Sequence, residues 1–491
     1  MQLTKTNYIQ FLNCPESLWL LKNKPSEYPA GEFSLFLQKL VKEGYEVEEY
    51  AQKLFPHGTL LPSNVTTEAT DKEINKGNGV FFQPSFETNE EVYARIDVLE
   101  KLKDGTWHIY EIKSSTRIKT DKKHNHLKDA CFQKYVLTEC GYNISKVSII
   151  HLNKDYCRNG SIVPNDLLKI VDVTEDVNRL YQSVSSEIIN ASNFIKKDLY
   201  DLDSCSCRFN TRVNHCDCFD YFNKDVPPHS IYEINRITAK KIKSLVDNDQ
   251  LSILDIPQNF ELNDSQKKQV ASNVQEAPII DKVRIEKILS DLKFPLHFID
   301  YETYPTAVPL LDDMKPHQHL PFQVSIHTLN KDGDLTHFEY LSEELVKPEK
   351  MLSEMEAFTK SEGTFISWHA SFEISRNKDM IEWHNEFSSY LTYMNGNMFD
   401  LETIFIKEYI DYRFKGRSSI KKVLPVLCPQ FSYGTLKIQD GTMALDTWGR
   451  MIMDKEFSYN KETTRENLLE YCKLDTLAMV EIYKNLIELT N

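Results

Sequence analysis

The order of strand-like and helix-like patterns along the 491 residues constrains the fold more than any other feature of the sequence. Residues 1–225 mix helical and strand periodicities, residues 226–284 carry helical periodicity alone, and residues 285–491 again alternate strands with helices. A chain of this length is too long for one hydrophobic core. The sequence therefore predicts an α/β multidomain protein: two α/β domains, at 1–225 and 285–491, joined by a helical connector at 226–284.

The composition predicts a folded protein without membrane segments. Hydrophobic residues make up 41% of the chain and aromatic residues 11%, without repeats or low-complexity tracts. No apolar run approaches the ~20 residues that cross a bilayer, and the start MQLTKTNYIQ is too polar for a signal peptide. We therefore expect a cytoplasmic protein, in which the 10 cysteines are buried thiols, catalytic groups or metal ligands instead of disulfides.

A predicted hairpin in the N-terminal domain carries a candidate metal site. The segment VYARIDVLEKLKDGTWHIYEIKSS reads as two strands, and Glu111 and Lys113, two residues apart, share one face. A two-residue loop would set Asp97 opposite Ile112, on the wrong face. A three-residue loop, 103–105, with Gly105 in the left-handed position, sets Asp97 opposite Glu111. An Asp with a Glu-x-Lys suits metal-dependent phosphodiester hydrolysis, although charged residues alternate along many half-exposed hairpins.

The motifs around this hairpin resemble those of a known nuclease family. GYEVEEYAQKLFPHG, ARIDVLEK, WHIYEIKSST and DACFQKYVL, in that order, resemble the motifs of RecB-type PD-(D/E)xK nucleases over about residues 1–220. The resemblance implies a restriction-endonuclease-like α/β fold. It also implies that Asp97, Glu111 and Lys113 are catalytic, that the two acids hold Mg²⁺ or Mn²⁺, that Gln133 supports them, and that Glu49 is a possible extra ligand.

A second candidate metal site is a group of cysteines. Cys205, Cys207, Cys216 and Cys218 lie close together in CSCRFNTRVNHCDC, and Cys14 lies far upstream. Four thiolates can hold Zn²⁺ or an iron-sulfur cluster, and spacing does not separate the two. One cysteine before Pro, followed by a late triplet, resembles the iron-sulfur staple of AddB-type and CRISPR-associated RecB-family nucleases. That resemblance implies a [4Fe-4S] cluster on Cys14, Cys205, Cys207 and Cys216, with Cys218 as a possible replacement.

A third candidate site begins in the stretch HFIDYET of the C-terminal domain. Strand geometry places Asp300 and Glu302 on one face, where two like charges favour a cation between them. Taken alone, the pair is weak evidence for a metal site, because many strands end in acidic residues. Glu373 follows a later apolar strand, and Tyr471 and Asp475 lie four residues apart on one helical face. Four such acids can hold two metal ions about 3.5 to 4 Å apart, as in two-metal phosphodiesterases.

The order of these motifs resembles the DnaQ-like DEDD exonucleases, which have the RNase H fold. The resemblance implies that Asp300, Glu302, Glu373 and Asp475 bind metal, that Tyr471 positions water, and that cleavage runs 3′ to 5′. Two positions depart from the family, which has Asp in place of Glu373 and Asn in place of His369. Asp400 is an accessory acid or a helix cap.

Charge indicates where a nucleic acid would bind. The net charge of −15 argues against a surface coated for non-specific nucleic-acid binding, but it leaves room for local basic channels. The run 113–128 and the segment KGRSSIKKVLP are such candidates, although solvated helix starts have the same composition. Ser418 or Ser419 would cap the helix that follows. The phosphate-contact candidates in the second segment are Lys415, Arg417, Lys421 and Lys422.

The whole arrangement resembles an uncharacterised bacterial family that joins a RecB-like domain with a cysteine cluster to a DnaQ-like domain. Its connector resembles a helix-hairpin-helix module without the usual glycine. We therefore expect a Mg²⁺- or Mn²⁺-dependent nuclease with two sites, acting on DNA single strands or ends. RNA is the alternative substrate. The non-enzymatic alternative is an iron-sulfur nucleic-acid-binding protein with one or both sites inactive.

Overall fold

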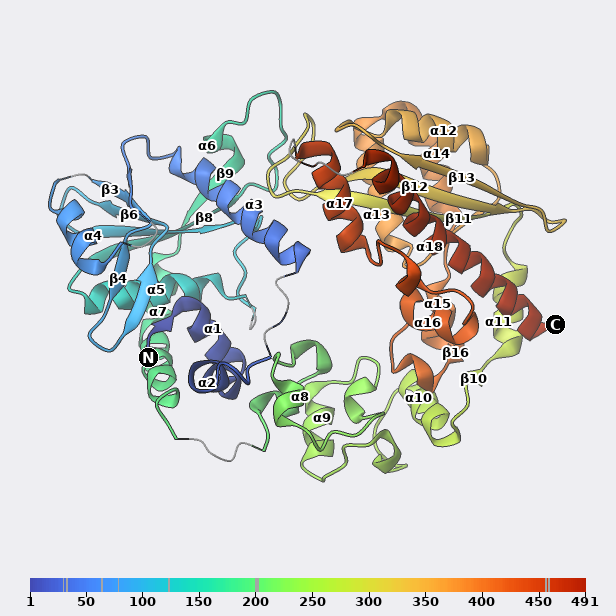
Figure 1. The fold of residues 1–491 in the computed structure, drawn as a ribbon, viewed down its shortest axis with the longest axis horizontal. Coiled ribbons are helices and arrows are strands. Elements are labelled where there is room, and N and C mark those ends of the chain that lie inside the picture. The colour runs from blue at the N-terminus through green and yellow to red at the C-terminus, as the bar shows by residue number, and fades with distance from the viewer. Residues whose placement is uncertain are drawn as a thin grey trace. The chain divides into compact units, whose positions relative to one another are not determined.

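The computed structural model describes residues 1–29, 31, 34–62, 65–77, 79–121, 124–198, 203–454, 457 and 460–491. The chain forms two compact units (Figure 1). Unit 1 consists of Met1–Val226 and Thr306–His317, and unit 2 of Pro227–Pro305 and Gln318–Asn491. Both units contain mixed sheets and helices, which confirms the α/β multidomain class.

Unit 1 is built on a six-stranded mixed sheet with the strand order β2-β3-β6-β7-β8-β9. β6 pairs with β7 in antiparallel orientation and β7 with β8 in parallel orientation. A three-stranded sheet, β1-β5-β4, accompanies it. The strands are β1 (Leu3–Thr4), β2 (Thr59–Leu60), β3 (Val80–Phe82), β4 (Ser85–Glu87), β5 (Val92–Arg95), β6 (Val98–Lys101), β7 (Trp107–Lys113), β8 (Ile144–Leu152) and β9 (Leu168–Asp172).

Helices cover both faces of the large sheet of unit 1. Ile109 of β7 packs with residues of α5 and α7 on one face, and Tyr110 packs with residues of α3 on the other. This alternation along β7 turns Glu111 and Lys113 toward α5. The helices are α1 (Lys5–Asn13), α2 (Pro15–Asn23), α3 (Leu35–Gln52), α4 (Thr67–Ile74), α5 (His126–Glu139), α6 (Pro164–Leu167), α7 (Thr174–Phe194) and α8 (Phe219–Phe222).

The segment Thr306–His317 completes unit 1, although it lies between two strands of unit 2 in the sequence. Ala307 and Val308 are fully or almost fully buried in the α3-side core. Arg158 donates to the backbone oxygens of Pro309, at 3.0 Å, and Leu310, at 2.6 Å. The segment therefore contributes both apolar burial and hydrogen bonds to this unit.

Unit 2 contains a five-stranded mixed sheet with the strand order β13-β12-β11-β14-β15. β11, β12 and β13 are antiparallel neighbours, whereas β14 and β15 run parallel to β11. A two-stranded sheet joins β10 (Ile279–Ile280) to β16 (Tyr409–Ile410). The five strands are β11 (Leu296–Pro305), β12 (His319–Leu329), β13 (Leu335–Leu341), β14 (Thr364–Ser367) and β15 (Met398–Asp400).

The two faces of the unit 2 sheet meet different helices. Ile299 and Tyr301 pack with residues of α12, α13 and α14. The alternate residue Phe298 packs against Tyr483 of α18 on the opposite face. Asp300 and Glu302 therefore face α18, the long helix near the C-terminus (Figure 1). The helices are α12 (Glu349–Thr359), α13 (Ser371–Trp383), α14 (Ser388–Gly396), α15 (Glu402–Lys407), α16 (Ile420–Leu427), α17 (Gly441–Met453) and α18 (Lys461–Thr490).

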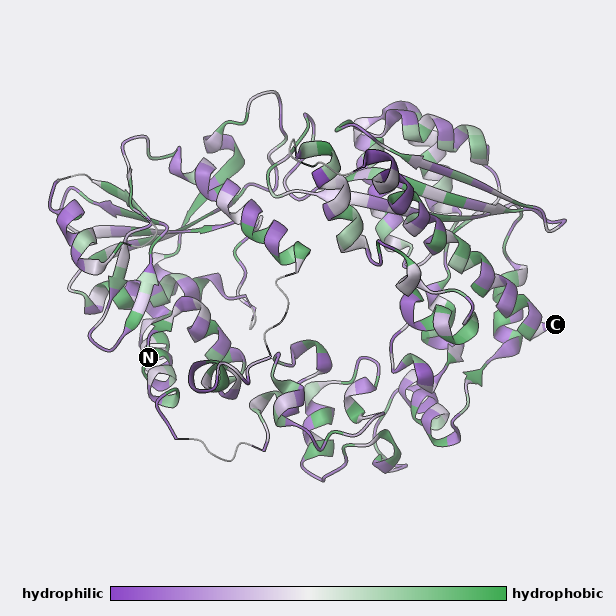
Figure 2. Cartoon of the chain, in the orientation of Figure 1, coloured by the Kyte–Doolittle hydropathy of each residue, from purple (hydrophilic) through white to green (hydrophobic). Residues whose placement is uncertain are grey.

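The predicted connector is part of unit 2 and contains α9 (Ala239–Val246) and α10 (Asp264–Gln275), followed by α11 (Lys282–Ser290). Figure 2 shows hydrophilic and hydrophobic residues mixed along the long helices α3 and α18, as expected of helices with one buried face. Within the described ranges, no helix combines the length and apolar character that a membrane span requires.

Candidate functional site

The C-terminal carboxylates that the sequence singled out meet in space. Asp300 and Glu302 project from β11 toward α18, which supplies Asp475. One oxygen from each of the three side chains lies within 4.8 Å of the others. The convergence follows because alternate residues of β11 share the face on which α18 packs, and Asp475 lies on the buried side of that helix. The first and third predicted motifs therefore form one acidic group.

Two tyrosines adjoin Asp475. Tyr471 lies one helical turn before it on α18, and Tyr433 comes from the loop between α16 and α17. The Tyr433 hydroxyl donates to Asp475 Oδ1 at 2.6 Å. The two rings lie 6.2 Å apart between centroids, and both side chains are buried. Tyr471 was predicted; Tyr433 was not, because no strand or helix periodicity of the sequence ties the loop to α18.

The grouping of acids raises their pKa values. Burial, followed by the charge of Asp475, raises the pKa of Glu302 to about 8. Burial and the charges of Asp475 and Glu302 raise the pKa of Asp300 well above its ordinary value. Burial raises the pKa of Asp475 to about 6, although hydrogen bonds from both tyrosines oppose it. At neutral pH the group therefore gains from a cation that stabilises its ionised form.

Glu373 lies near this group but not within it. Among the described residues, the acids within 4.8 Å of one another are Asp300, Glu302 and Asp475. Glu373, in the first turn of α13, is close enough for its charge to raise the pKa of both Asp300 and Glu302. Burial raises its own pKa to about 7. Its Oε2 atom is buried without a hydrogen-bond partner, so it is an oxygen still free to take a ligand.

His369 and Asp400 lie beside Glu373. His369 has a left-handed backbone, with φ of 70°, and its N–H donates to Asp400 Oδ1 at 3.0 Å. The same Asp400 oxygen accepts from the N–H of Glu402 at 3.1 Å, at the start of α15. Asp400 thus caps backbone groups, which is the structural alternative that the sequence left open.

The donor set of the C-terminal group fits Mg²⁺ or Mn²⁺. All of its ligand atoms are carboxylate oxygens, which these hard cations prefer. Asp300, Glu302 and Asp475 would hold the ion, with the unpartnered Glu373 Oε2 as a further oxygen donor. Sulfur is also nearby, because the thiol of Cys472 lies 3.7 Å from Asp300 Oδ2.

The N-terminal hairpin has the register that the three-residue loop predicts. Val98 faces Tyr110 and Lys101 faces Trp107, and Gly105 has a φ of 82°. Continuing this register one position beyond β6 sets Asp97 opposite Glu111. Asp97 Oδ2 accepts the N–H of Ile112 at 2.8 Å. The predicted bulged loop is therefore confirmed, and the two acids share one site.

Lysines surround Glu111. Its Oε1 accepts from Lys5 of α1 at 2.6 Å and from Lys113 at 2.7 Å, and Gln133 of α5 donates to Oε2. Burial alone would raise the pKa of Glu111, but the charges of Lys113 and Lys5 bring it below its ordinary value. For Asp97, burial and the charge of Glu111 raise the pKa to about 7. This site is thus largely neutralised by the protein itself.

Helix α3 brings Glu48 to the N-terminal site, whereas the predicted ligand from this helix was its neighbour Glu49. Gln83 donates to Glu48 at 2.5 Å and to Asp97 at 3.4 Å, and the charge of Glu48 acts on the pKa of Asp97. Glu49, which the family resemblance marked, is exposed. Among the described residues, Asp97 and Glu111 do not belong to a group of three potential ligands within 4.8 Å. Two carboxylates with Glu48 nearby fit a divalent ion less well than the C-terminal group does.

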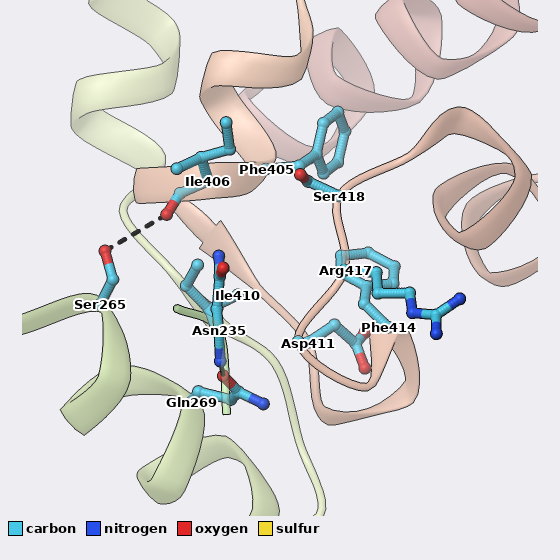
Figure 3. Close-up of a pocket in the computed structure, with 11 residues that line it drawn as sticks. Asn235, Ser265, Gln269, Phe405, Ile406, Ile410, Asp411, Phe414, Arg417 and Ser418 are labelled. Atoms are coloured by element: carbon cyan, nitrogen blue, oxygen red, sulfur yellow. Dashed lines mark hydrogen bonds between the residues drawn. The ribbon is translucent and has the colours of Figure 1, made fainter. Parts of the chain in front are cut away.

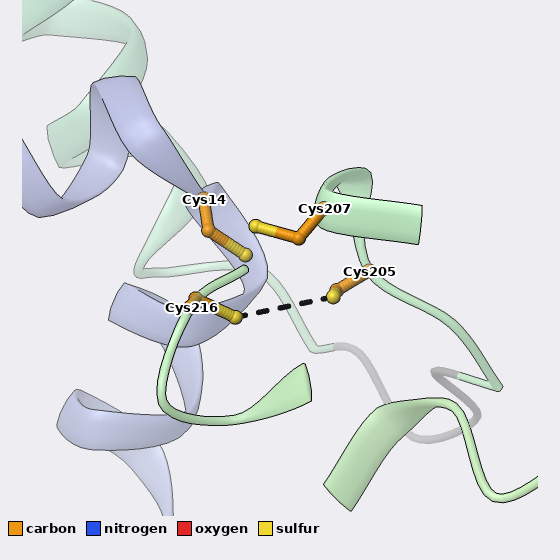
Figure 4. Close-up of side chains that lie close together, drawn as sticks. All are labelled: Cys14, Cys205, Cys207 and Cys216. Carbon is orange, nitrogen blue, oxygen red and sulfur yellow. Dashed lines mark hydrogen bonds between the residues drawn. The ribbon is translucent and has the colours of Figure 1, made fainter. Parts of the chain in front are cut away.

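Four cysteines of unit 1 form a compact group (Figure 4). One sulfur from each of Cys14, Cys205, Cys207 and Cys216 lies within 4.8 Å of the others. Cys14 joins α1 to α2, so the group ties the start of the chain to residues 205–216. Four thiols suit Zn²⁺ or an iron-sulfur cluster. Cys218 is outside the group, and its sulfur contacts the Ser17 hydroxyl at 3.5 Å.

Acidic and amide side chains support the cysteines. Glu16 Oε2 accepts from the N–H of Ser206 at 3.1 Å and from its hydroxyl at 2.5 Å, and lies 3.4 Å from the Cys14 sulfur. The Asn223 amide donates to the Cys205 sulfur at 3.4 Å. These contacts orient the thiols from both ends of the group, as outer contacts do around metal ligands.

The predicted basic residues of unit 2 occupy different environments. Lys415 lies 3.6 Å from Glu233, and Arg417 is exposed at a small pocket (Figure 3). That pocket, between α10 and the segment from α15 to Ser418, has a volume of about 20 Å³. It has room for one or two water molecules and not for a nucleotide.

Lys421 lies over the ring of Tyr433, whose hydroxyl donates to Asp475, whereas Lys422 is exposed. In the other basic run, Lys122 and Lys123 lie outside the described residues.

Comparison with known proteins finds one stretch of the chain that matches a family model. No curated protein matches the sequence. The stretch that does match a family model begins at β11, includes Asp300, Glu302 and Glu373, and ends before Tyr471 and Asp475. Residues 297–419 match the model of a domain of unknown function, DUF2779.

Proposed function

We propose that this chain is a Mg²⁺- or Mn²⁺-dependent nuclease that hydrolyses DNA at single strands or ends, with the C-terminal carboxylate group as its principal site. The observation that carries the proposal is the convergence of Asp300, Glu302 and Asp475 within 4.8 Å. Their raised pKa values add to it, because a divalent cation would stabilise the charges that burial opposes.

The chain's own side chains have distinct roles in this proposal. Asp300, Glu302 and Asp475 bind the metal, Tyr471 orients the attacking water, and Tyr433 fixes the Asp475 carboxylate. A divalent ion held by these acids would supply charge stabilisation at the phosphate and would lower the pKa of the attacking water. Hydrolysis joins the water oxygen to phosphorus and breaks one bridging P–O bond. A proton from the water leaves through the site, and the departing oxygen takes up a proton.

The sheet of unit 2 supports the finer form of this proposal. β11 carries the first acids at the centre of a mixed sheet, and α18 crosses the face that they occupy. This arrangement agrees with an RNase H-like, DnaQ-type exonuclease domain, and the motif order supports 3′ to 5′ polarity. In unit 1, the confirmed hairpin register supports a restriction-endonuclease-like domain in which Asp97, Glu111, Lys113 and Gln133 form a second site.

Unit 1 also holds the proposed cluster. Cys14, Cys205, Cys207 and Cys216 would carry [4Fe-4S], with Zn²⁺ as the alternative. We assign this group a structural role, because it joins segments of the chain that are almost two hundred residues apart. Hydrogen bonds from Ser206 to Glu16 and from Asn223 to Cys205 surround the group. Iron analysis and the visible spectrum of protein purified without oxygen test the assignment, and a colourless, iron-free protein would refute it.

One observation favours a second candidate function for unit 1. Both oxygens of Glu111 are occupied by Lys5, Lys113 and Gln133, which leaves fewer positions for a metal ion. In this alternative, unit 1 binds nucleic acid with its iron-sulfur or zinc group and does not cleave it. Cleavage would then depend on unit 2 alone.

The test is digestion of oligonucleotides labelled at either end, with each site mutated in turn. Matched single-stranded DNA and RNA are incubated with Mg²⁺ or Mn²⁺ and wild-type, Asp97→Ala, Asp300→Ala or doubly mutated protein. We expect stepwise shortening from the 3′ end that Asp300→Ala removes. Faster digestion of RNA would reassign the substrate. Intact cleavage by the double mutant would refute both sites.

A further inference from the structure

A lysine is built into the C-terminal carboxylate site. Lys421 is the second residue of α16, and its Nζ donates to the backbone oxygen of Gln439 at 2.8 Å. The same Nζ lies 5.4 Å from the ring centroid of Tyr433 and 5.6 Å from that of Tyr471. Cations are attracted to the faces of tyrosine rings at this range. Three contacts therefore hold the ammonium group in one place.

The two rings under Lys421 are the ones that adjoin Asp475. Tyr433 donates its hydroxyl to Asp475 Oδ1 at 2.6 Å, and Tyr471 precedes Asp475 by one turn of α18. The charge of Lys421 also acts on Glu302 and Asp475, whose pKa values it lowers against the effect of burial. The ammonium group thus lies within electrostatic reach of two predicted metal ligands that come from different elements.

A cation at this position has two opposite effects. It offsets the repulsion among three carboxylates, and by the same charge it opposes the binding of a divalent ion to them. A phosphodiester brings the negative charge that the lysine would then contact.

We propose that Lys421 is a catalytic residue that donates from Nζ to a non-bridging oxygen of the phosphate cleaved at the C-terminal site, and that Tyr433 is the residue that positions it against Asp475. The inference rests on the proposed function and adds a substrate contact that the acids cannot make. Lys421 forms no covalent bond. It stabilises charge that grows on the phosphate oxygens during hydrolysis, as preorganised donors do in other acyl- and phosphoryl-transfer sites.

The test combines Mn²⁺ affinity with cleavage in the full-length protein. Lys421→Ala, Lys421→Arg and Tyr433→Phe are compared with Lys437→Ala, a control that removes an exposed lysine from the loop that carries Tyr433. Binding of Mn²⁺ alone is measured by calorimetry, and kcat/KM on single-stranded DNA by end-labelled digestion. Circular dichroism checks that each variant is folded.

We expect Lys421→Ala to lower kcat/KM by about 100-fold, the effect of removing one preorganised donor. The same variant should bind Mn²⁺ about fivefold more tightly, since a repelling charge at short range has been removed. Arginine at 421 should restore part of the activity, Tyr433→Phe should reduce it by about tenfold through the loss of one hydrogen bond, and Lys437→Ala should match wild type.

A purely structural role for Lys421 predicts a different result. If Lys421→Ala weakens Mn²⁺ binding together with cleavage, or leaves both unchanged, the inference is overturned while the proposed function stands. If the wild-type protein neither binds Mn²⁺ nor cleaves, the proposed function fails and the phosphate contact fails with it.

Discussion

The two carboxylate sites of this chain are neutralised in different ways. In unit 1, Glu111 accepts from Lys5 at 2.6 Å and from Lys113 at 2.7 Å, and its pKa is lowered although burial opposes this. In unit 2, Asp300, Glu302 and Asp475 come within 4.8 Å of one another, and burial raises the pKa of each. In the unit 1 site, lysine side chains neutralise the charge of Glu111. In the unit 2 site, three carboxylates have one lysine nearby, Lys421.

This difference indicates which site depends more on an external ion. A carboxylate with two ammonium neighbours is already ionised, so a metal ion must compete with the lysines for it. Three clustered carboxylates with one lysine nearby repel one another until a divalent cation binds. We therefore expect the unit 2 site to be the stronger metal site, and unit 1 to depend on its cysteine group for metal-linked stability.

The largest expected effect is on cleavage. Asp300→Ala should lower the rate of metal-dependent digestion by about 1,000-fold, which corresponds to about 4 kcal/mol of transition-state stabilisation. Asp97→Ala is the matched substitution in unit 1 and should have a smaller effect on the same substrate. Rates from end-labelled DNA measure both. Equal losses in the two variants would remove the proposed asymmetry.

The cysteine group of unit 1 extends the comparison between the two units. We assign its metal a role in stability, whereas the metal at the unit 2 carboxylates has a role in catalysis. Cys207→Ser should destabilise unit 1 by several kcal/mol, on the order of 3 to 5, because metal binding free energy is also folding free energy. Thermal unfolding, combined with limited proteolysis of unit 1, measures the change in its free energy of unfolding. Cys131→Ser is the control, since Cys131 is buried outside the group. Similar losses of metal from both variants would contradict the assignment.

The pH dependence of stability should differ between the units once divalent ions are removed with EDTA. In unit 2, the pKa values of Glu302 (about 8), Glu373 (about 7) and Asp475 (about 6) are raised above those of exposed acids. The folded state then binds more protons than the unfolded state, so unit 2 loses stability as pH rises from 5 to 8. The loss should amount to several kcal/mol, since a tenfold change in the protonation constant of each acid corresponds to about 1.4 kcal/mol.

Unit 1 should respond less over the same range. The raised pKa of Asp97, about 7, gives the same sign, but the lowered pKa of Glu111 contributes stability that is lost only as pH falls below that of an ordinary glutamate. Chemical denaturation at several pH values in EDTA measures each transition. Glu302→Gln should flatten the unit 2 dependence; an unchanged slope in that variant would exclude Glu302 as its source.

The smallest expected effect comes from the loop that sets the unit 1 site. Gly105 has a φ of 82°, and a Cβ atom there would meet no neighbour, so alanine adds backbone strain without a clash. Gly105→Ala should destabilise unit 1 by about 1 kcal/mol. Urea denaturation measures this change. Cleavage by the unit 2 site should be unaffected, and a loss there would mean that the two sites are not independent.

Local periodicity predicted much of both sites. The hairpin loop was predictable because only the three-residue loop sets Asp97 opposite Glu111, and this register is observed. The meeting of Asp300 and Glu302 with Asp475 was expected from the family resemblance of the motif order, and strand and helix periods place each acid on a definite face. These are short-range properties that the sequence carries directly.

Other parts depend on long-range packing that periodicity does not encode. Glu48 and not Glu49 approaches Asp97, a difference of one residue around α3 that its apolar pattern leaves open. Lys5 reaches Glu111 from the first helix, and Tyr433 reaches Asp475 from a loop. The segment Thr306–His317 packs in unit 1 although both strands that flank it belong to unit 2. Such contacts are fixed by tertiary structure.

The most direct test of the central claim is the number of Mn²⁺ ions bound to each site, measured by electron paramagnetic resonance during titration. The comparison is between wild-type protein, the Asp300→Asn/Glu302→Gln variant and the Asp97→Asn variant. We predict that the first variant loses the tightly bound Mn²⁺ and that the second retains it. Retention of tight Mn²⁺ binding by the Asp300→Asn/Glu302→Gln variant would contradict the account.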